Sequence, residues 1–160
     1  MPDAIDQALY RQVMGHFPTG VVVIASPGPV GTAIGSFASL SLDPPLVTFS
    51  ITKTSSSWPK IRDTGVFCAS VLAEDQEHVS RAFAQSGADK FAGLDWTPTA
   101  WGPAIAGTLA SVLCTVEQVH PAGDHDIVVG RVQQLVTHRE DGPLLFFRGD
   151  YDLSPGAQPC

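Results

Sequence analysis

Apolar segments rich in β-branched residues recur along the chain, and turn-forming residues separate them. Each segment lies between glycine, proline or polar residues, which is the pattern of β-strands joined by turns. Helical patterns do not alternate regularly with these segments, so a parallel sheet built from strand–helix–strand units is disfavoured. The pattern predicts a mainly β protein, an antiparallel barrel with two or three peripheral helices. The predicted strands are residues 21–25, 46–51, 66–72, 109–119, 127–136 and 144–148.

Three segments have helical patterns. The segment 3–15 carries one apolar stripe, with Asp3 as a candidate N-cap; the stripe consists of Ile5, Leu9 and Val13. The short segment 58–63 follows two serines that can cap a helix, and Pro59 stands in its first turn, where proline is tolerated. The segment 75–85 is amphipathic with acidic residues in its first turn. We expect all three helices to pack outside the barrel.

Composition limits the partners of this chain. With 160 residues and 44% hydrophobic content, the chain is expected to form one domain over residues 1–153, followed by a disordered tail at 154–160. The formal net charge is −7 and Lys and Arg form no run, which argues against nucleic acid. No apolar run is long enough for a bilayer, and no signal peptide is evident. Three widely spaced cysteines favour a reducing cytoplasm.

Two polar runs are candidates for binding an anionic ligand. The first lies between Gly31 and Leu46 and ends at Asp43, because the two following prolines stop a strand. Its small hydroxyl residues beside glycines allow close approach and can donate to phosphate oxygens. The second run, 52–57, contains Lys53 and precedes the predicted helix 58–63, where free N–H groups attract anions. A serine-rich edge strand and an ordinary serine-capped helix explain the same patterns.

Other constellations point less clearly to chemistry. His120, Asp124, His125 and Asp126 cluster on one turn, but no further ligand has the spacing of a metal site, so no metal is predicted. A serine hydrolase is disfavoured because the G-x-S-x-G element is missing from the sequence. The long connection 87–107 is rich in aromatic residues, which suit a loop over a ligand as well as one covering the barrel or a dimer contact.

Seven segments, taken in this order, resemble the flavin reductase-like family, whose fold is the FMN-binding split barrel. The resemblance spans nearly the whole chain. It implies an NAD(P)H:flavin oxidoreductase that reduces FMN or FAD and supplies the reduced flavin to a partner monooxygenase, and it implies a homodimer. The matching segments are FPTGVVVI (17–24), GTAIGSFASLSLDPPL (31–46), TKTSSSW (52–58), FCASVLAEDQ (67–76), DKFAG (89–93), GDHDIVVG (123–130) and PLLFFRGDY (143–151).

The resemblance also implies which residues form the site. The turn Gly123-Asp124-His125 matches the family element whose histidine lies beside the nicotinamide, so His125 is the candidate catalytic residue. Without the resemblance, His125 suits a solvated hairpin turn, and Arg148 suits pairing with Asp150 or Asp152. The implied flavin-binding residues are Thr32, Gly35, Ser36, Phe37, Ala38, Ser39, Ser41, Lys53, Ser55, Ser56, Ser57, Lys90, Phe91 and Arg148.

Two other functions stay open at this stage. One is a non-enzymatic split barrel that binds flavin or another small ligand, and the other is a split-barrel oxidase that retains its flavin. For a reductase, NADH is weakly preferred over NADPH, because a site that reads a 2′-phosphate needs clustered arginines and those of this chain are scattered along the sequence.

Overall fold

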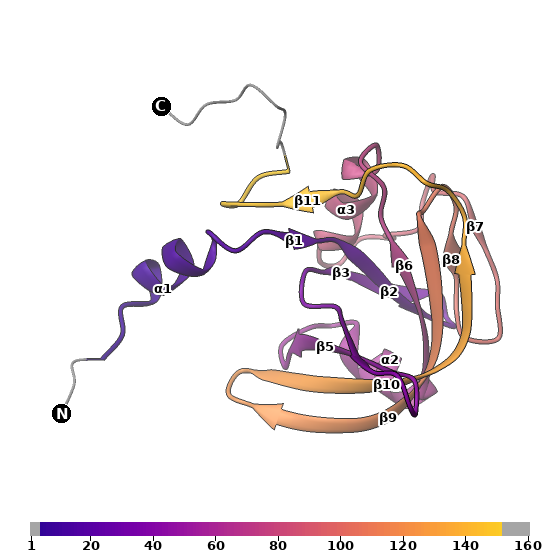
Figure 1. Ribbon diagram of the computed structural model, residues 1–160, viewed down its shortest axis with the longest axis horizontal. Coiled ribbons are helices and arrows are strands. Elements are labelled where there is room, and N and C mark those ends of the chain that lie inside the picture. The colour runs from indigo at the N-terminus through magenta and orange to yellow at the C-terminus, as the bar shows by residue number, and fades with distance from the viewer. Residues whose placement is uncertain (1–3, 152–160) are drawn as a thin grey trace.

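One antiparallel sheet of seven strands dominates the computed structural model, which describes residues 4–151. The strands follow the order β3-β2-β6-β9-β10-β5-β4. In Figure 1 the sheet bends around its interior, and the long β9–β10 hairpin curves along the lower side. The strands are β2 (Val22–Ser26), β3 (Val30–Ile34), β4 (Ala38–Ser41), β5 (Leu46–Thr52), β6 (Val66–Val71), β9 (Ala110–Ala122) and β10 (His125–Thr137).

Two short ladders and three helices complete the described fold. The strands β1 (Thr19–Gly20) and β11 (Leu145–Phe146) pair with each other, as do β7 (Trp96–Thr97) and β8 (Ala104–Ile105). The helices are α1 (Gln7–Met14), α2 (Trp58–Thr64) and α3 (Glu77–Ala84). The predicted mainly β, antiparallel class with peripheral helices is confirmed.

A serine hydroxyl joins two strands on opposite parts of the curved sheet. Ser36, which follows β3, donates to the carbonyl of Ser50 on β5 at 2.9 Å and accepts from its N–H at 3.0 Å. On the far side, the β9–β10 ladder shifts register between Val129 and Gly130. A shift of this kind bends a strand and increases its twist. The curved sheet thus brings the end of β3 against β5, although the two strands lie far apart in the strand order.

The core has two clusters that share β2. Val22 and Ile24 pack inside the curved sheet, in a cluster that contains Phe49 and Phe67, whose rings meet edge to face at 5.2 Å. The alternate residues Val21, Val23 and Ala25 pack on the outer face of the sheet with Phe83 of α3. A strand covered on both faces needs a continuous apolar sequence. This explains the unbroken run 21–25.

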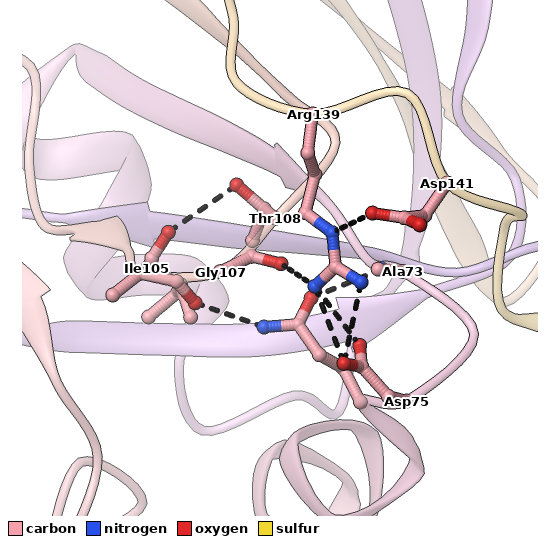
Figure 2. Close-up of polar contacts among 9 residues, drawn as sticks. Ala73, Asp75, Ile105, Gly107, Thr108, Arg139 and Asp141 are labelled. Atoms are coloured by element: carbon pink, nitrogen blue, oxygen red, sulfur yellow. Dashed lines mark hydrogen bonds and ion pairs between the residues drawn. The ribbon is translucent and has the colours of Figure 1, made fainter.

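A polar clamp ties three loops together at one end of the sheet (Figure 2). Arg139, after β10, pairs with Asp141 and with Asp75, and its Nη1 donates to the carbonyl of Gly107 at 3.0 Å. The buried Gln76 side chain accepts from the N–H of Ala73 at 3.0 Å and donates to the carbonyl of the residue before Gly107 at 2.8 Å. These bonds hold the start of α3 against the connection that precedes β9.

Several element boundaries differ from the prediction. The N-cap of α1 is Asp6, whose carboxyl accepts from the N–H of Ala8 at 2.7 Å, while Asp3 lies outside the described residues, as does the tail 154–160. The predicted loop 120–126 is wrong, because β9 and β10 continue to a tight turn at Gly123, which has φ +63°. The last strand ends at Phe146. No helix within residues 4–151 has the length and apolarity needed to cross a membrane.

Candidate functional site

A pocket of about 480 Å³ lies against β3 and β5, beneath the connection between α1 and β1. We call it the central pocket. Its volume falls within the range of small-molecule sites, about 300–1,000 Å³. Six residues that the sequence singled out line it: Thr32, Gly35, Ser36, Ser55, His125 and Arg148.

His125 reaches the central pocket from the first position of β10, opposite Thr52 of β5. Its Nδ1 lies 2.6 Å from Oδ1 of Asp124, and the side chain is 45% exposed. The hydrogen bond from His125, together with the nearby imidazole, lowers the pKa of Asp124. If Nδ1 carries the proton of this bond, Nε2 is left to bond a ligand. Asp124 is 94% exposed, so the pair orients the imidazole only weakly.

Hydrogen bonds anchor the turn that carries His125 to two places, the first residue of α2 and the polar segment that precedes this helix. Asp126 turns inward, and its Oδ2 accepts from Nε1 of Trp58 at 2.8 Å. Lys53 donates from Nζ to the carbonyl of Gly123 at 2.8 Å. Its backbone N–H donates to the carbonyl of Asp124 at 2.9 Å. Lys53, predicted beside the flavin phosphate, lines neither this pocket nor the next one and supports the turn instead.

A second pocket of about 670 Å³ lies between the β2–β3 turn, α2 and the loop 87–91. We call it the lysine pocket. Lys90 reaches into it and donates from Nζ to the carbonyl of Gly31 at 3.1 Å. Ser57 donates to the same carbonyl at 3.0 Å. Burial lowers the pKa of Lys90. Lys60, which the sequence reasoning missed, also lines this pocket, as do Asp63 and Asp89, so the pocket holds two ammonium groups and two carboxylates.

The two pockets adjoin along β3. Consecutive residues line them, with Thr32 and Ser55 on the central pocket and Gly31 and Ser56 on the lysine pocket. The side chain of Ser55 caps the start of α2. Its Oγ accepts from the N–H groups of Ser57 and Trp58, at 3.3 Å each. Ser57, one of the two predicted caps, occupies the N-cap position, but its own side chain makes no capping hydrogen bond.

The structure separates the remaining predicted residues by role. Phe91 is only 8% exposed and packs edge to face on Phe83 at 4.9 Å, so most of its ring belongs to the core although it lines the lysine pocket. Gly31 leaves space for the same ring of Phe83, whose Cε1 would lie 3.0 Å from an added Cβ. Four residues of the β3–β5 connection line neither pocket: Phe37, Ala38, Ser39 and Ser41.

Arg148 lies at the rim of the central pocket with a left-handed backbone, φ +52°. Asp150 accepts from the N–H of Tyr151 at 2.7 Å, and no ion pair joins Asp150 to Arg148 in the structure. Asp152 lies outside the described residues. The sequence reasoning missed three apolar residues that line the central pocket, because they occur in a helix end, a turn and a short strand: Met14, Phe17 and Phe146.

A sequence model described as a flavin reductase like domain matches residues 14–153. The chain belongs to the flavin reductase-like family. It is 49% identical over 153 residues to HsaB, the reductase subunit of a flavin-dependent monooxygenase from Rhodococcus jostii, covering 93% of this chain and 78% of that protein. It is 44% identical to a flavin reductase from Pseudomonas putida, covering 92% and 90%.

Solved structures of similar proteins share the fold. Nitrilotriacetate monooxygenase component B from Mycobacterium thermoresistibile superposes with a TM-score of 0.90 at 48% identity, covering 99% of this chain and 92% of that one. The NADH:FAD oxidoreductase SgcE6 of Streptomyces globisporus, solved with NAD and FAD fragments, has a TM-score of 0.88 at 34% identity, covering 96% of each. The family resemblance and the fold predicted from the sequence are confirmed.

Proposed function

We propose that this chain is an NAD(P)H-dependent flavin reductase that reduces FMN or FAD and passes the reduced flavin to a partner monooxygenase. The observation that carries this proposal is the pair of adjoining pockets along β3. One presents His125 and Arg148, and the other presents Lys90 and serine hydroxyls. Relatives at 40% identity or more are named as flavin reductases or as reductase subunits of monooxygenases.

The donor set suits a flavin. In this assignment the flavin phosphate lies in the lysine pocket and binds the ammonium groups of Lys60 and Lys90, which also balance the charges of Asp63 and Asp89. The ring system lies in the central pocket against β3, with the hydroxyl of Thr32 as a donor, because the hydroxyl of Ser36 already donates to Ser50. When bound, the flavin supplies the hydride chemistry. The chain binds and orients it, and His125 holds the nicotinamide at the mouth of the central pocket.

A second copy of the chain is proposed to cover α1. The helix stands away from the sheet in Figure 1 and has no buried residue. Its apolar stripe is open to solvent, with Leu9 55% and Val13 57% exposed. Such a stripe marks a contact surface. Met14 and Phe17 continue it into the wall of the central pocket, so a copy packed there also closes that pocket.

Sedimentation velocity tests this dimer. The wild type is expected to sediment as a dimer, and a variant with Leu9→Glu and Val13→Glu as a monomer. Gln7→Glu adds one negative charge on the polar side of α1 and is expected to leave the dimer intact. A monomeric wild type, or a dimeric double variant, contradicts the assignment of α1 to the interface.

Two buried thiols support a cytoplasmic location. Cys68 and Cys114 are free and fully buried on the neighbouring strands β6 and β9. Burial raises the pKa of Cys114 to about 12, which keeps the thiol protonated and unreactive. Unpaired buried thiols are usual in proteins of reducing compartments.

Consumption of NADH with and without added flavin tests the function. A reductase that uses flavin as a substrate consumes NADH only when free FMN or FAD is added, and loses flavin during purification. A barrel that merely binds flavin does not consume NADH. An oxidase of the same fold retains stoichiometric flavin, and added flavin does not change its rate. Parallel reactions with NADPH give the nicotinamide preference, and the two flavins give the flavin preference.

A further inference from the structure

A third pocket adjoins the central pocket on the side of α1. It has a volume of about 490 Å³, and we call it the basic pocket. Gly15 and Arg148 line both pockets, so a ligand can extend from one into the other. The remaining lining residues are Arg11, Gln12, His16 and Gly149.

The basic pocket concentrates positive charge on an acidic chain. Two arginines and a histidine line it without any carboxylate, although the net charge of the chain is −7. Neither Arg11 nor Arg148 forms an ion pair with a carboxylate of residues 4–151. His16 directs Nδ1 to the carbonyl of Gln12 at 2.8 Å, which leaves Nε2 for another partner. A concave surface of one sign attracts ligands of the opposite charge.

The backbone holds these side chains together. The N–H of Arg148 donates to the carbonyl of Gly15 at 3.0 Å, and the N–H of Gly15 donates to the carbonyl of Arg11 at 2.9 Å. Arg148 is the single non-glycine residue within the described range 4–151 with a positive φ. Such a conformation is strained for a residue with a side chain and is found preferentially at functional sites. Folding thus brings to one place two arginines that lie near opposite ends of the sequence.

A simpler role exists for Arg11. It stands in the last turn of α1, where a cation interacts favourably with the negative end of the helix dipole. That role does not involve Arg148, which belongs to another segment, and it does not explain why the pocket opens onto the nicotinamide side of the central pocket. The two roles predict different substrate dependence.

We propose that the basic pocket binds a phosphate group of the nicotinamide dinucleotide. This inference rests on the proposed reductase function. With the nicotinamide ring at His125, the ribose and phosphates must leave the central pocket, and the flavin phosphate occupies the lysine pocket. The opening shared through Arg148 leads to guanidinium groups, which bind phosphate oxygens in pairs. The arginines that are scattered in the sequence are therefore gathered where a dinucleotide needs them.

Kinetics with three hydride donors test the inference. Dihydronicotinamide riboside carries the reducing ring without any phosphate, NADH carries the pyrophosphate, and NADPH adds a 2′-phosphate. In Arg11→Gln we expect the ratio of kcat/KM for NADH to that for the riboside to fall about tenfold, through KM. Arg62→Gln removes the same charge from an exposed helix position that lines none of the three pockets, and its ratio should stay within about twofold of wild type.

The outcomes separate cleanly. Equal losses for NADH and NADPH assign the pocket to the pyrophosphate, a larger loss for NADPH assigns it to the 2′-phosphate, and both support the inference. An unchanged ratio overturns it, as does a parallel loss for NADH and the riboside, which indicates a structural effect of Arg11. A raised flavin dissociation constant with unchanged KM for NADH also overturns it. A wild type that oxidises none of the three donors refutes the reductase function itself.

Discussion

The contact between Trp58 and Asp126 should determine how firmly the turn carrying His125 is held. Asp126→Ala removes the acceptor of the indole N–H, which lies at 2.8 Å. Trp58 is 3% exposed and Asp126 8%, so water does not readily replace the lost partner. A buried donor without a partner costs about 1–3 kcal/mol. The edge-to-face contact of Trp58 with Phe49, at 6.5 Å, remains in the variant.

Asp126→Asn is the matched control, because its amide oxygen can accept the same hydrogen bond in a side chain of the same shape. We expect Asp126→Ala to lower the free energy of unfolding by about 2 kcal/mol, and Asp126→Asn by less than about 1 kcal/mol. For a chain of this size, 2 kcal/mol corresponds to a fall in Tm of about 4–8 °C. Urea unfolding with fluorescence detection gives the free energies directly.

The reasoning also predicts non-additivity. Trp58→Phe removes the donor, so the Asp126→Ala change should cost less in that background than in the wild type. Additive costs would show that the two side chains do not interact energetically. Equal stability of the Ala and Asn variants of Asp126 would refute the account of the hydrogen bond.

Three further predictions follow from the pockets and the core. His125→Ala should lower kcat/KM for NADH about five- to thirtyfold while flavin affinity changes far less; a collapse of flavin binding would show that the nicotinamide and flavin ends have been exchanged. Flavin affinity should weaken as pH rises through the pKa of Lys90, which is lowered from its usual 10.5, because the ammonium loses the charge that attracts phosphate. Lys90→Gln should bind flavin more weakly, with an affinity that does not depend on pH in this range. If the affinity of the variant depends on pH as that of the wild type does, Lys90 is not part of the site. Gly102→Ala should destabilise the fold by about 3 kcal/mol, because at φ +120° its Cβ would lie 2.6 Å from the carbonyl oxygen of Ala25; Gly65→Ala, at φ +69° in open space, should cost only about 1 kcal/mol in the same denaturation assay.

The parts of the fold that bury apolar side chains were predictable from the sequence. The run 21–25 is continuous because both faces of β2 are covered, and the segment 46–51 alternates because β5 has one buried face. The far end of the β9–β10 hairpin was not predictable in this way. Beyond Val119 its side chains are mostly exposed, so no apolar pattern marks the strand.

Pro121 misled the prediction for a physical reason. Proline usually marks a turn, because it cannot donate to a ladder. The partner strand β6 pairs only with residues 110–115 of β9, so at Pro121 the strand has β10 on one side alone. A missing N–H can then face solvent without cost, and the strand continues through the proline to Gly123.

The site divides into a wall that the sequence revealed and a rim that it did not. Thr32 and Ser36, with the serines before α2, belong to contiguous polar runs whose hydroxyls the family resemblance could locate. The rim combines Gly15 and Phe17 with Phe146 and Arg148. These residues meet because β1 pairs with β11, through the partners Thr19 and Phe146, and because the N–H of Arg148 donates to the carbonyl of Gly15. A two-residue ladder contains too few side chains to leave a pattern in the sequence, yet together with the hydrogen bond from Arg148 to Gly15 it brings arginines from the two ends of the chain to one pocket. The basic pocket is therefore a property of the fold that the sequence reveals only once this pairing is known.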